Sequence, residues 1–151
     1  GRLRKLREEL YCENPYANAL FNYYRQLCDQ KQIAVTFEIE SSLCGILDEY
    51  DLNTLLSNLL KNALEAAEGA SQPEVCLTIT QQKQMLFIRC VNSCGQPRPK
   101  KKLIQGNGTK IITQIAEKYQ GQAQWEKDGS RLVAEVLLNK TQTEFEKASA
   151  A

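Results

Sequence analysis

The sequence predicts an α+β fold, a two-layer α/β sandwich in which helices cover one face of a mixed sheet. Segments with helical periodicity are interleaved with segments that alternate every second residue. Short, polar, hairpin-like turns join neighbouring strand segments. The 151 residues are 42% hydrophobic and 25% charged, which suits one globular domain.

Four periodic segments fill the first half of the chain. We expect helices at 2–11, 16–31 and 51–69, and a half-buried strand at 33–39. The first helix begins without a cap, as the end of a longer helix would. Asn14-Pro15 supplies a cap and first turn for the second. The third has the strongest i, i+3, i+4 pattern, formed by its leucines and Ala63.

The second half predicts two hairpins and a helix. We expect strands at 74–80, 85–91, 122–127 and 131–138, and a helix at 108–119. The polar residues 81–84 turn the first hairpin and Asp128-Gly129 the second. We expect residues 92–107 to form a loop and the tail 140–151 to be frayed.

Composition excludes several classes of protein and site. Nineteen basic and eighteen acidic residues give a net charge of +1, so no global field favours nucleic acid or a membrane surface. No apolar stretch reaches the roughly 18 to 20 residues needed to cross a bilayer. The chain has no histidine, which removes imidazole bases and ligands. We expect the six cysteines to be free thiols.

A polar row accompanies the leucines of the third helix. Asn58, Asn62 and Glu65 recur at i, i+4 and i+7. The amide oxygen of asparagine is a hard, neutral ligand, suited to a magnesium ion held mainly by phosphates and water. The alternative is a solvated or hydrogen-bonding helix face, and the helix alone does not distinguish the two.

Two neighbouring segments favour phosphate. Glycines at 106 and 108 open the helix at 108–119, where close backbone approach and free N–H groups attract anions. The basic run 98–102 precedes them and could close over polyphosphate. Each signal is weak in isolation, because glycines and charge runs also occur in loops without a ligand.

Three segments in order carry a resemblance: DLNTLLSNLLKNALEAA at 51–67, VNSCG at 91–95 and GNGTKIITQIAEKYQGQ at 106–122. They resemble the ATP-binding domain of sensor histidine kinases, of the Bergerat-fold (GHKL) ATPase superfamily, particularly receptor kinases of the Gram-positive quorum-sensing type. The resemblance implies an ATP-binding kinase domain at 14–139, the end of a dimerisation and phosphoacceptor helix at 1–13, and a tail at 140–151.

The resemblance also implies roles for single residues. Asn62 matches the asparagine that coordinates magnesium, and Asn58 stands where hydrolytic relatives place a glutamate base. A carboxamide there cannot accept a proton, which implies phosphoryl transfer in preference to water activation. Glu65 would orient the row or contact a metal-bound water. Asn92 matches the adenine-binding aspartate, and Gly95 follows with a glycine spacing that departs from DxGxG.

The implied phosphate contacts lie further along the chain. Residues 93–105 would form the ATP lid. The candidate phosphate partners are Gly106, Gly108, Thr109 and Lys110 of the glycine box, and Lys100, Lys101 and Lys102 of the lid.

The implied function is a protein histidine kinase with ATP and Mg²⁺ as cofactors. Its partners would be a phosphoacceptor histidine of the same receptor dimer and a response regulator, on the cytoplasmic side of a membrane-bound receptor. We expect no nucleic acid and no direct membrane contact. The alternative is a non-catalytic module of the same fold for binding or dimer signalling, with weakened or lost nucleotide binding. A serine kinase of the anti-sigma type is disfavoured by the predicted N-terminal helix.

Overall fold

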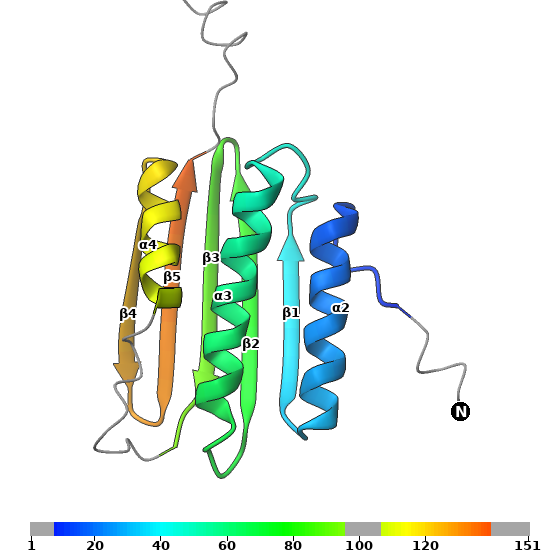
Figure 1. The fold of residues 1–151 in the computed structure, drawn as a ribbon, viewed down its shortest axis with the longest axis vertical. Helices are drawn as coiled ribbons and strands as arrows, with labels where there is room; N and C mark the ends of the chain where they lie inside the picture. Colours follow the sequence, from blue (N-terminus) through cyan, green and yellow to red (C-terminus); the bar gives the residue numbers. More distant parts are fainter. Residues whose placement is uncertain (1–7, 96–106, 140–151) are drawn as a thin grey trace, which may run out of the picture.

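The computed structural model describes residues 8–95 and 107–139 (Figure 1). Within them lie the helices α2 (Pro15–Gln30), α3 (Glu49–Ala67) and α4 (Asn107–Lys118). The strands are β1 (Ala34–Glu40), β2 (Glu74–Gln82), β3 (Met85–Ser93), β4 (Gln122–Asp128) and β5 (Arg131–Asn139). None of the helices in these ranges is long and apolar enough to cross a membrane.

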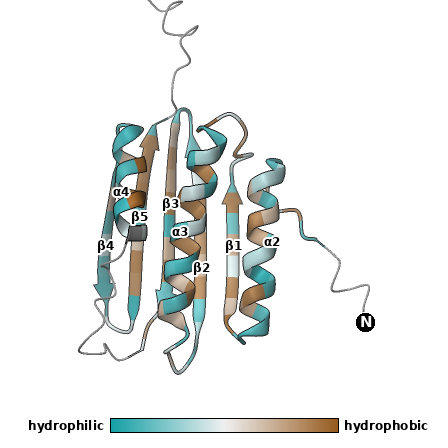
Figure 2. Cartoon of the chain, in the orientation of Figure 1, coloured by the Kyte–Doolittle hydropathy of each residue, from teal (hydrophilic) through white to brown (hydrophobic). Residues whose placement is uncertain are grey.

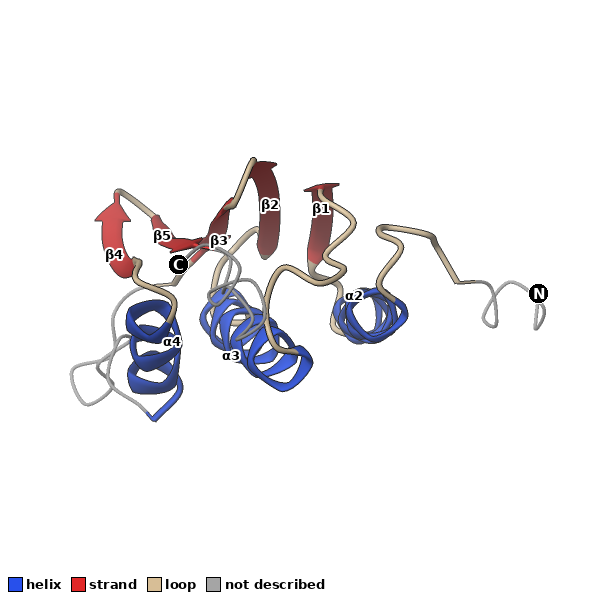
Figure 3. Ribbon diagram, turned by 90° about the horizontal axis from the view of Figure 1, so that it is seen from above, coloured by secondary structure: helices blue, strands red, loops and turns tan. Residues whose placement is uncertain are grey.

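One mixed sheet organises the described chain. Its strand order is β1-β2-β3-β5-β4; β1 pairs with β2 in parallel, and the other neighbours are antiparallel. All three helices lie on the same face of the sheet (Figure 3). The predicted α+β two-layer sandwich is therefore confirmed.

Capping side chains fix where the first two helices begin. Asn14 Oδ1 accepts hydrogen bonds from the backbone N–H groups of Tyr16 and Ala17, at 3.0 and 3.1 Å. Asp48 Oδ1 accepts from the N–H of Asp51 at 3.1 Å, so α3 begins two residues before the predicted start. Such caps satisfy N–H groups that have no partner within the helix.

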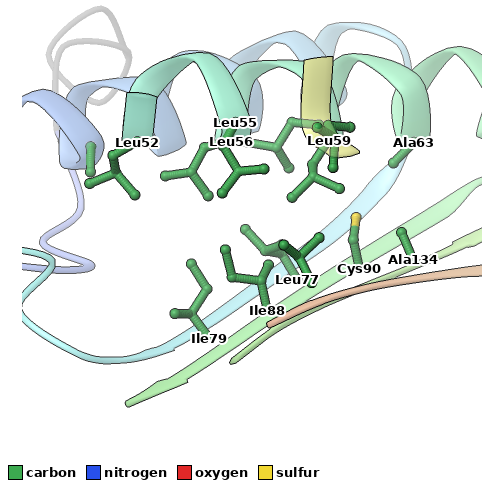
Figure 4. Packing of buried hydrophobic residues seen from close by; sticks show 14 of the residues in the cluster. Leu52, Leu55, Leu56, Leu59, Ala63, Leu77, Ile79, Ile88, Cys90 and Ala134 are labelled. Carbon is green, nitrogen blue, oxygen red and sulfur yellow. The ribbon is translucent and has the colours of Figure 1, made fainter. Parts of the chain in front are cut away.

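The core lies between α3 and the central strands. Leucines of α3 point down onto Leu77, Ile79 and Ile88 of the sheet (Figure 4). Full burial of one such side chain stabilises the fold by roughly 1.5–3 kcal/mol. The edge strand β4 is mainly hydrophilic, in contrast to β3 and β5 (Figure 2). Burial of the leucine stripe thus holds α3 against the middle of the sheet.

The described part of the first predicted helix is not helical. Residues 8–11 have no regular secondary structure, and Leu10 is 81% exposed. Asn22 of α2 accepts from Glu9 N at 2.8 Å and donates to Glu9 O at 2.8 Å. Asn18 accepts from Tyr11 N at 2.7 Å. These side-chain contacts compete with the backbone hydrogen bonds of a helix, so the prediction was wrong for this part; residues 1–7 lie outside the described ranges.

Both hairpin turns differ from their predictions: the first is shorter, and the second is shifted by one residue. Residues 81 and 82 belong to β2, which leaves only Lys83 and Gln84 as the first loop. Asp128 pairs with Arg131, so the second loop is Gly129-Ser130 and not Asp128-Gly129. Gly129 has φ +62°, a left-handed conformation that glycine adopts without strain. The tail at 140–151 lies outside the described residues.

Candidate functional site

The two asparagines of the α3 row are half-buried and differ in their contacts. Asn58 Nδ2 donates to the carbonyl oxygen of Thr54 at 2.7 Å, and no described group donates to its Oδ1. Asn62 makes no hydrogen bond with any described residue. Both side chains therefore keep an amide oxygen available to a ligand.

Gly108 brings the start of α4 against this row. A Cβ atom placed on Gly108 would lie 3.0 Å from Asn58 Oδ1 and 3.3 Å from both Oδ1 and Nδ2 of Asn62. Glycine is the residue that permits this approach without displacing the amides. The first N–H groups of the twelve-residue helix α4 thus lie beside two carboxamides, an arrangement suited to an anion.

Asn92 occupies the inner face at the end of β3. The alternation Leu86, Ile88, Cys90 and Asn92 places it on the buried side, and it is 4% exposed. Its Nδ2 donates to the carbonyl oxygen of Ser93 at 2.9 Å. No described group donates to its Oδ1, so this oxygen is the acceptor available to a bound molecule.

A small cavity lies between Asn62 and Asn92. Its walls are Leu59, Asn62 and Ala63 of α3, Thr109 of α4, and Cys90, Asn92, Trp125, Leu132 and Ala134 of the sheet. Ala63 lies opposite Cys90 and Ala134 in Figure 4, where small side chains interrupt the large aliphatic packing. Burial raises the pKa of the Cys90 thiol to about 12, so this wall is uncharged at neutral pH.

An open groove adjoins the cavity on the α4 side. It has a volume of about 320 Å³ and is lined by Thr109, Lys110, Thr113, Gln114 and Trp125. Thr109 and Trp125 line both spaces. Lys110 is exposed, so the groove carries a positive charge close to the start of α4.

The remaining predicted site residues lie elsewhere. Glu65 is exposed and does not line the cavity. Gly95 packs against the backbone of Gly69 so closely that an added Cβ would collide with the Gly69 carbonyl. Gly95 therefore positions the end of β3 against the end of α3. Four predicted phosphate partners lie outside the described residues: Lys100, Lys101, Lys102 and Gly106.

A charged contact fixes α4 to α3 at the other end of the helix. Asp51 Oδ2 accepts from Lys118 Nζ at 2.7 Å and from Tyr119 Oη at 2.6 Å. Tyr119 Oη in turn accepts from Asp48 N at 3.1 Å. Burial raises the pKa of Asp51, but the hydrogen bonds from Lys118 and Tyr119 outweigh burial and hold it below its ordinary value. The contact joins the C-terminal end of α4 to the first turn of α3.

Sequence reasoning missed Trp125 and the small residues of the cavity. The available signal was the position of Trp125 in β4, where alternation places it on the same face as Ala123. The sequence pattern does not distinguish Ala63, Cys90 and Ala134 from ordinary core residues. Their small size leaves a cavity only because the three side chains face one another in the folded chain. All six cysteines are free, as predicted.

The donor set suits a hard cation that keeps other ligands. Among the described residues, no group of three or more cysteine, aspartate or glutamate side chains could hold a metal ion. Asn58 and Asn62 offer amide oxygens beside an anion-attracting helix start. Magnesium commonly binds through one or two protein oxygens together with phosphates and water, so these residues fit magnesium bound with a nucleotide.

Comparisons with known proteins identify the family and the fold of the chain. A family model described as the GHKL domain matches residues 47–139. The catalytic domain of histidine kinase ThkA, in a nucleotide-free form, is 20% identical with a TM-score of 0.67, covering 86% of this chain and 94% of that chain. Histidine kinase AdeS of Acinetobacter baumannii is 14% identical with a TM-score of 0.62, covering 93% and 76% respectively.

A complex of ThkA with the response regulator protein TrrA is also similar. Its kinase chain is 18% identical with a TM-score of 0.62, and the match covers 87% of this chain and 41% of that chain. At these identities the structural matches establish a shared fold. No curated protein matches the chain significantly.

Proposed function

Because the chain belongs to the GHKL domain family, we propose that it binds Mg-ATP and acts as the catalytic domain of a sensor histidine kinase. The observation that carries the proposal is the cavity shared by Asn62, Asn92 and Thr109, which come from three separate elements. On one side the cavity is apolar and contains the buried amide acceptor of Asn92. On the other side it reaches the first turn of α4, which lies beside Asn58 and Asn62. An adenine base and a phosphate chain need these two environments.

Asn92 is the proposed base-recognising residue. Its Oδ1 accepts a hydrogen bond from the adenine amino group, while Nδ2 remains held by the Ser93 carbonyl. The uncharged Cys90 and Ala134 beside it contact the ring. A site built to pair a buried polar group discriminates strongly against a base that lacks the matching donor.

The start of α4 is the proposed phosphate site. The backbone at Gly108 and Thr109 donates to phosphate oxygens, and Asn62 supplies an amide oxygen to the magnesium ion. A magnesium ion held there would supply charge neutralisation to the phosphates. Asn58 holds its amide through the Thr54 carbonyl and offers no proton acceptor to a water molecule.

The phosphoryl acceptor lies outside these residues. The chain contains no histidine, so a kinase of this class transfers the γ-phosphoryl group to a histidine that another part of the receptor dimer supplies. We propose a response regulator as the next partner, as ThkA has TrrA. We further propose a cytoplasmic position in a receptor of the quorum-sensing type, on the motif resemblance at 51–67 and 91–95.

Calorimetric titration of the 151-residue chain with ATP, with and without magnesium, tests the proposal. Ligand at about 100 times its dissociation constant adds roughly 2.7 kcal/mol to folded-state stability, so thermal unfolding provides a second readout. We expect magnesium-dependent binding that Asn62→Ala weakens by about tenfold or more, since loss of a hydrogen bond or ligand to a charged group costs roughly 1.5–3 kcal/mol.

Asn53→Ala is the matched control. Asn53 lies on the same helix and, like Asn58, donates to the carbonyl four residues before it, but it does not line the cavity. We expect its binding to equal that of the unmodified chain. If millimolar ATP neither binds nor shifts the unfolding temperature, the non-catalytic binding module is the better assignment.

A further inference from the structure

The cavity lined by Asn62 and Asn92, here called the base cavity, is far too small for adenine. Its volume among the described residues is about 20 Å³, which is room for about one water molecule. Ligand pockets in proteins commonly measure roughly 300–1,000 Å³. Some wall of the cavity must therefore move before adenine reaches Asn92.

Most of the wall is held in place. Leu59 is 3% exposed and packs in the main core, and Leu132 is 8% exposed. The side chains of Ala63, Cys90 and Ala134 are already small, and their backbones belong to α3, β3 and β5 respectively. Movement of these residues would separate the helix from the sheet.

Trp125 is the large wall residue that is only half-buried. It lies on the edge strand β4, opposite Ala134, which in turn pairs with Cys90. Its indole N–H makes no hydrogen bond with a described residue, so apolar contact alone holds the ring. Trp125 also lines the adjoining groove of about 320 Å³, which offers space into which the ring can turn.

We propose that Trp125 is the gate of the base cavity: its indole turns toward the adjoining groove as adenine enters, and then forms one wall of the occupied site. This inference rests on the proposed function. Trp125, Ala134 and Cys90 are neighbours across three adjacent strands. Because Ala134 and Cys90 are small, movement of the indole away from them opens space beside Asn92. Trp125 thus controls the entry of the base into the cavity.

The chain carries its own reporter for this movement. Trp125 is its single tryptophan, so emission excited at a wavelength selective for tryptophan comes from the gate. On titration with magnesium and a non-hydrolysable ATP analogue, we expect a change in emission and in acrylamide quenching. Both changes should follow the dissociation constant measured by calorimetry.

Kinetics of the variant Trp125→Ala provide the second test. A binding-competent state populated at about 10% lowers apparent affinity about tenfold, and removal of the gate removes this cost. We therefore expect ADP with a fluorophore on its ribose to associate about tenfold faster. Trp125→Phe is a second variant if the alanine variant does not fold, and it should show a smaller acceleration.

Phe37→Ala is the matched control, because Phe37 is a half-buried aromatic residue on the opposite edge strand β1. Its association rate should be unchanged although its stability falls. Binding by calorimetry with unchanged tryptophan emission overturns the gate and leaves the nucleotide site standing, as does an unchanged association rate in Trp125→Ala. Absence of binding by calorimetry overturns the proposed function and the gate with it.

Discussion

The substitution Gly108→Ala should impair the proposed nucleotide site without destabilising the fold. The added methyl group would lie 3.0 Å from Asn58 Oδ1 and 3.3 Å from two atoms of Asn62. These separations are a few tenths of an ångström shorter than an ordinary van der Waals contact, so the two amides must shift. Gly108 does not have a left-handed φ, so alanine itself is not strained there.

The substitution should change binding much more than it changes stability. Alanine is favoured over glycine in helix interiors by roughly 0.5–1 kcal/mol, which offsets the crowding of the amides. We expect the free energy of unfolding to change by less than about 0.5 kcal/mol. The added methyl group displaces Asn62 and keeps a phosphate group away from the backbone N–H groups, so at least one hydrogen bond to a charged group is lost. Such a loss costs roughly 1.5–3 kcal/mol, which lowers the affinity about tenfold to a hundredfold.

Calorimetry with Mg-ATP measures the affinity, and urea unfolding measures the stability. Gly69→Ala is the matched control, because a Cβ on Gly69 meets no atom within 4 Å. It should change neither quantity. Affinity equal to that of the unmodified chain in Gly108→Ala would refute the reasoning that the backbone of Gly108 and the asparagine row form the phosphate site.

Two further substitutions test contacts that position the elements. The lowered pKa of Asp51 means that its carboxylate stabilises the fold above its ordinary pKa of about 3.9, and that this contribution is lost as the pH falls through the lower folded value. Asp51→Asn should lower the free energy of unfolding by about 1–2 kcal/mol at pH 7, because it weakens the hydrogen bonds from Lys118 and Tyr119. The stability of the variant should also depend less on pH below about pH 4. Urea midpoints that are the same for both proteins from pH 3 to 7 would contradict this. Asn22→Ala should release the segment at Glu9 and accelerate amide hydrogen exchange there, whereas unchanged protection would show that other contacts hold it.

Local periodicity predicted most of the fold. Leucines at helical spacing identified α3 within two residues of its observed ends, and alternation identified the strands that flank the two hairpins. The N-terminal segment shows where this reasoning fails. Its leucine spacing favours a helix, but Tyr11 packs on Phe21 and Phe37 with ring centroids 6.0 and 5.3 Å away, and Asn22 holds the adjoining backbone. These partners lie far along the chain, so the segment's own pattern does not contain them.

The sequence by itself determined which side chains carry polar chemistry and which face of each element they occupy. The period of α3 places Asn58 and Asn62 in one row, and the alternation of β3 places Asn92 on the buried face. Only the tertiary structure decided that Asn92 and Trp125 share one cavity with Asn62, and that Gly108 lies so close to the row that an added Cβ would be 3.0 Å from Asn58 Oδ1. Periodicity specifies direction within one element, whereas the distance between elements depends on how their side chains pack against one another.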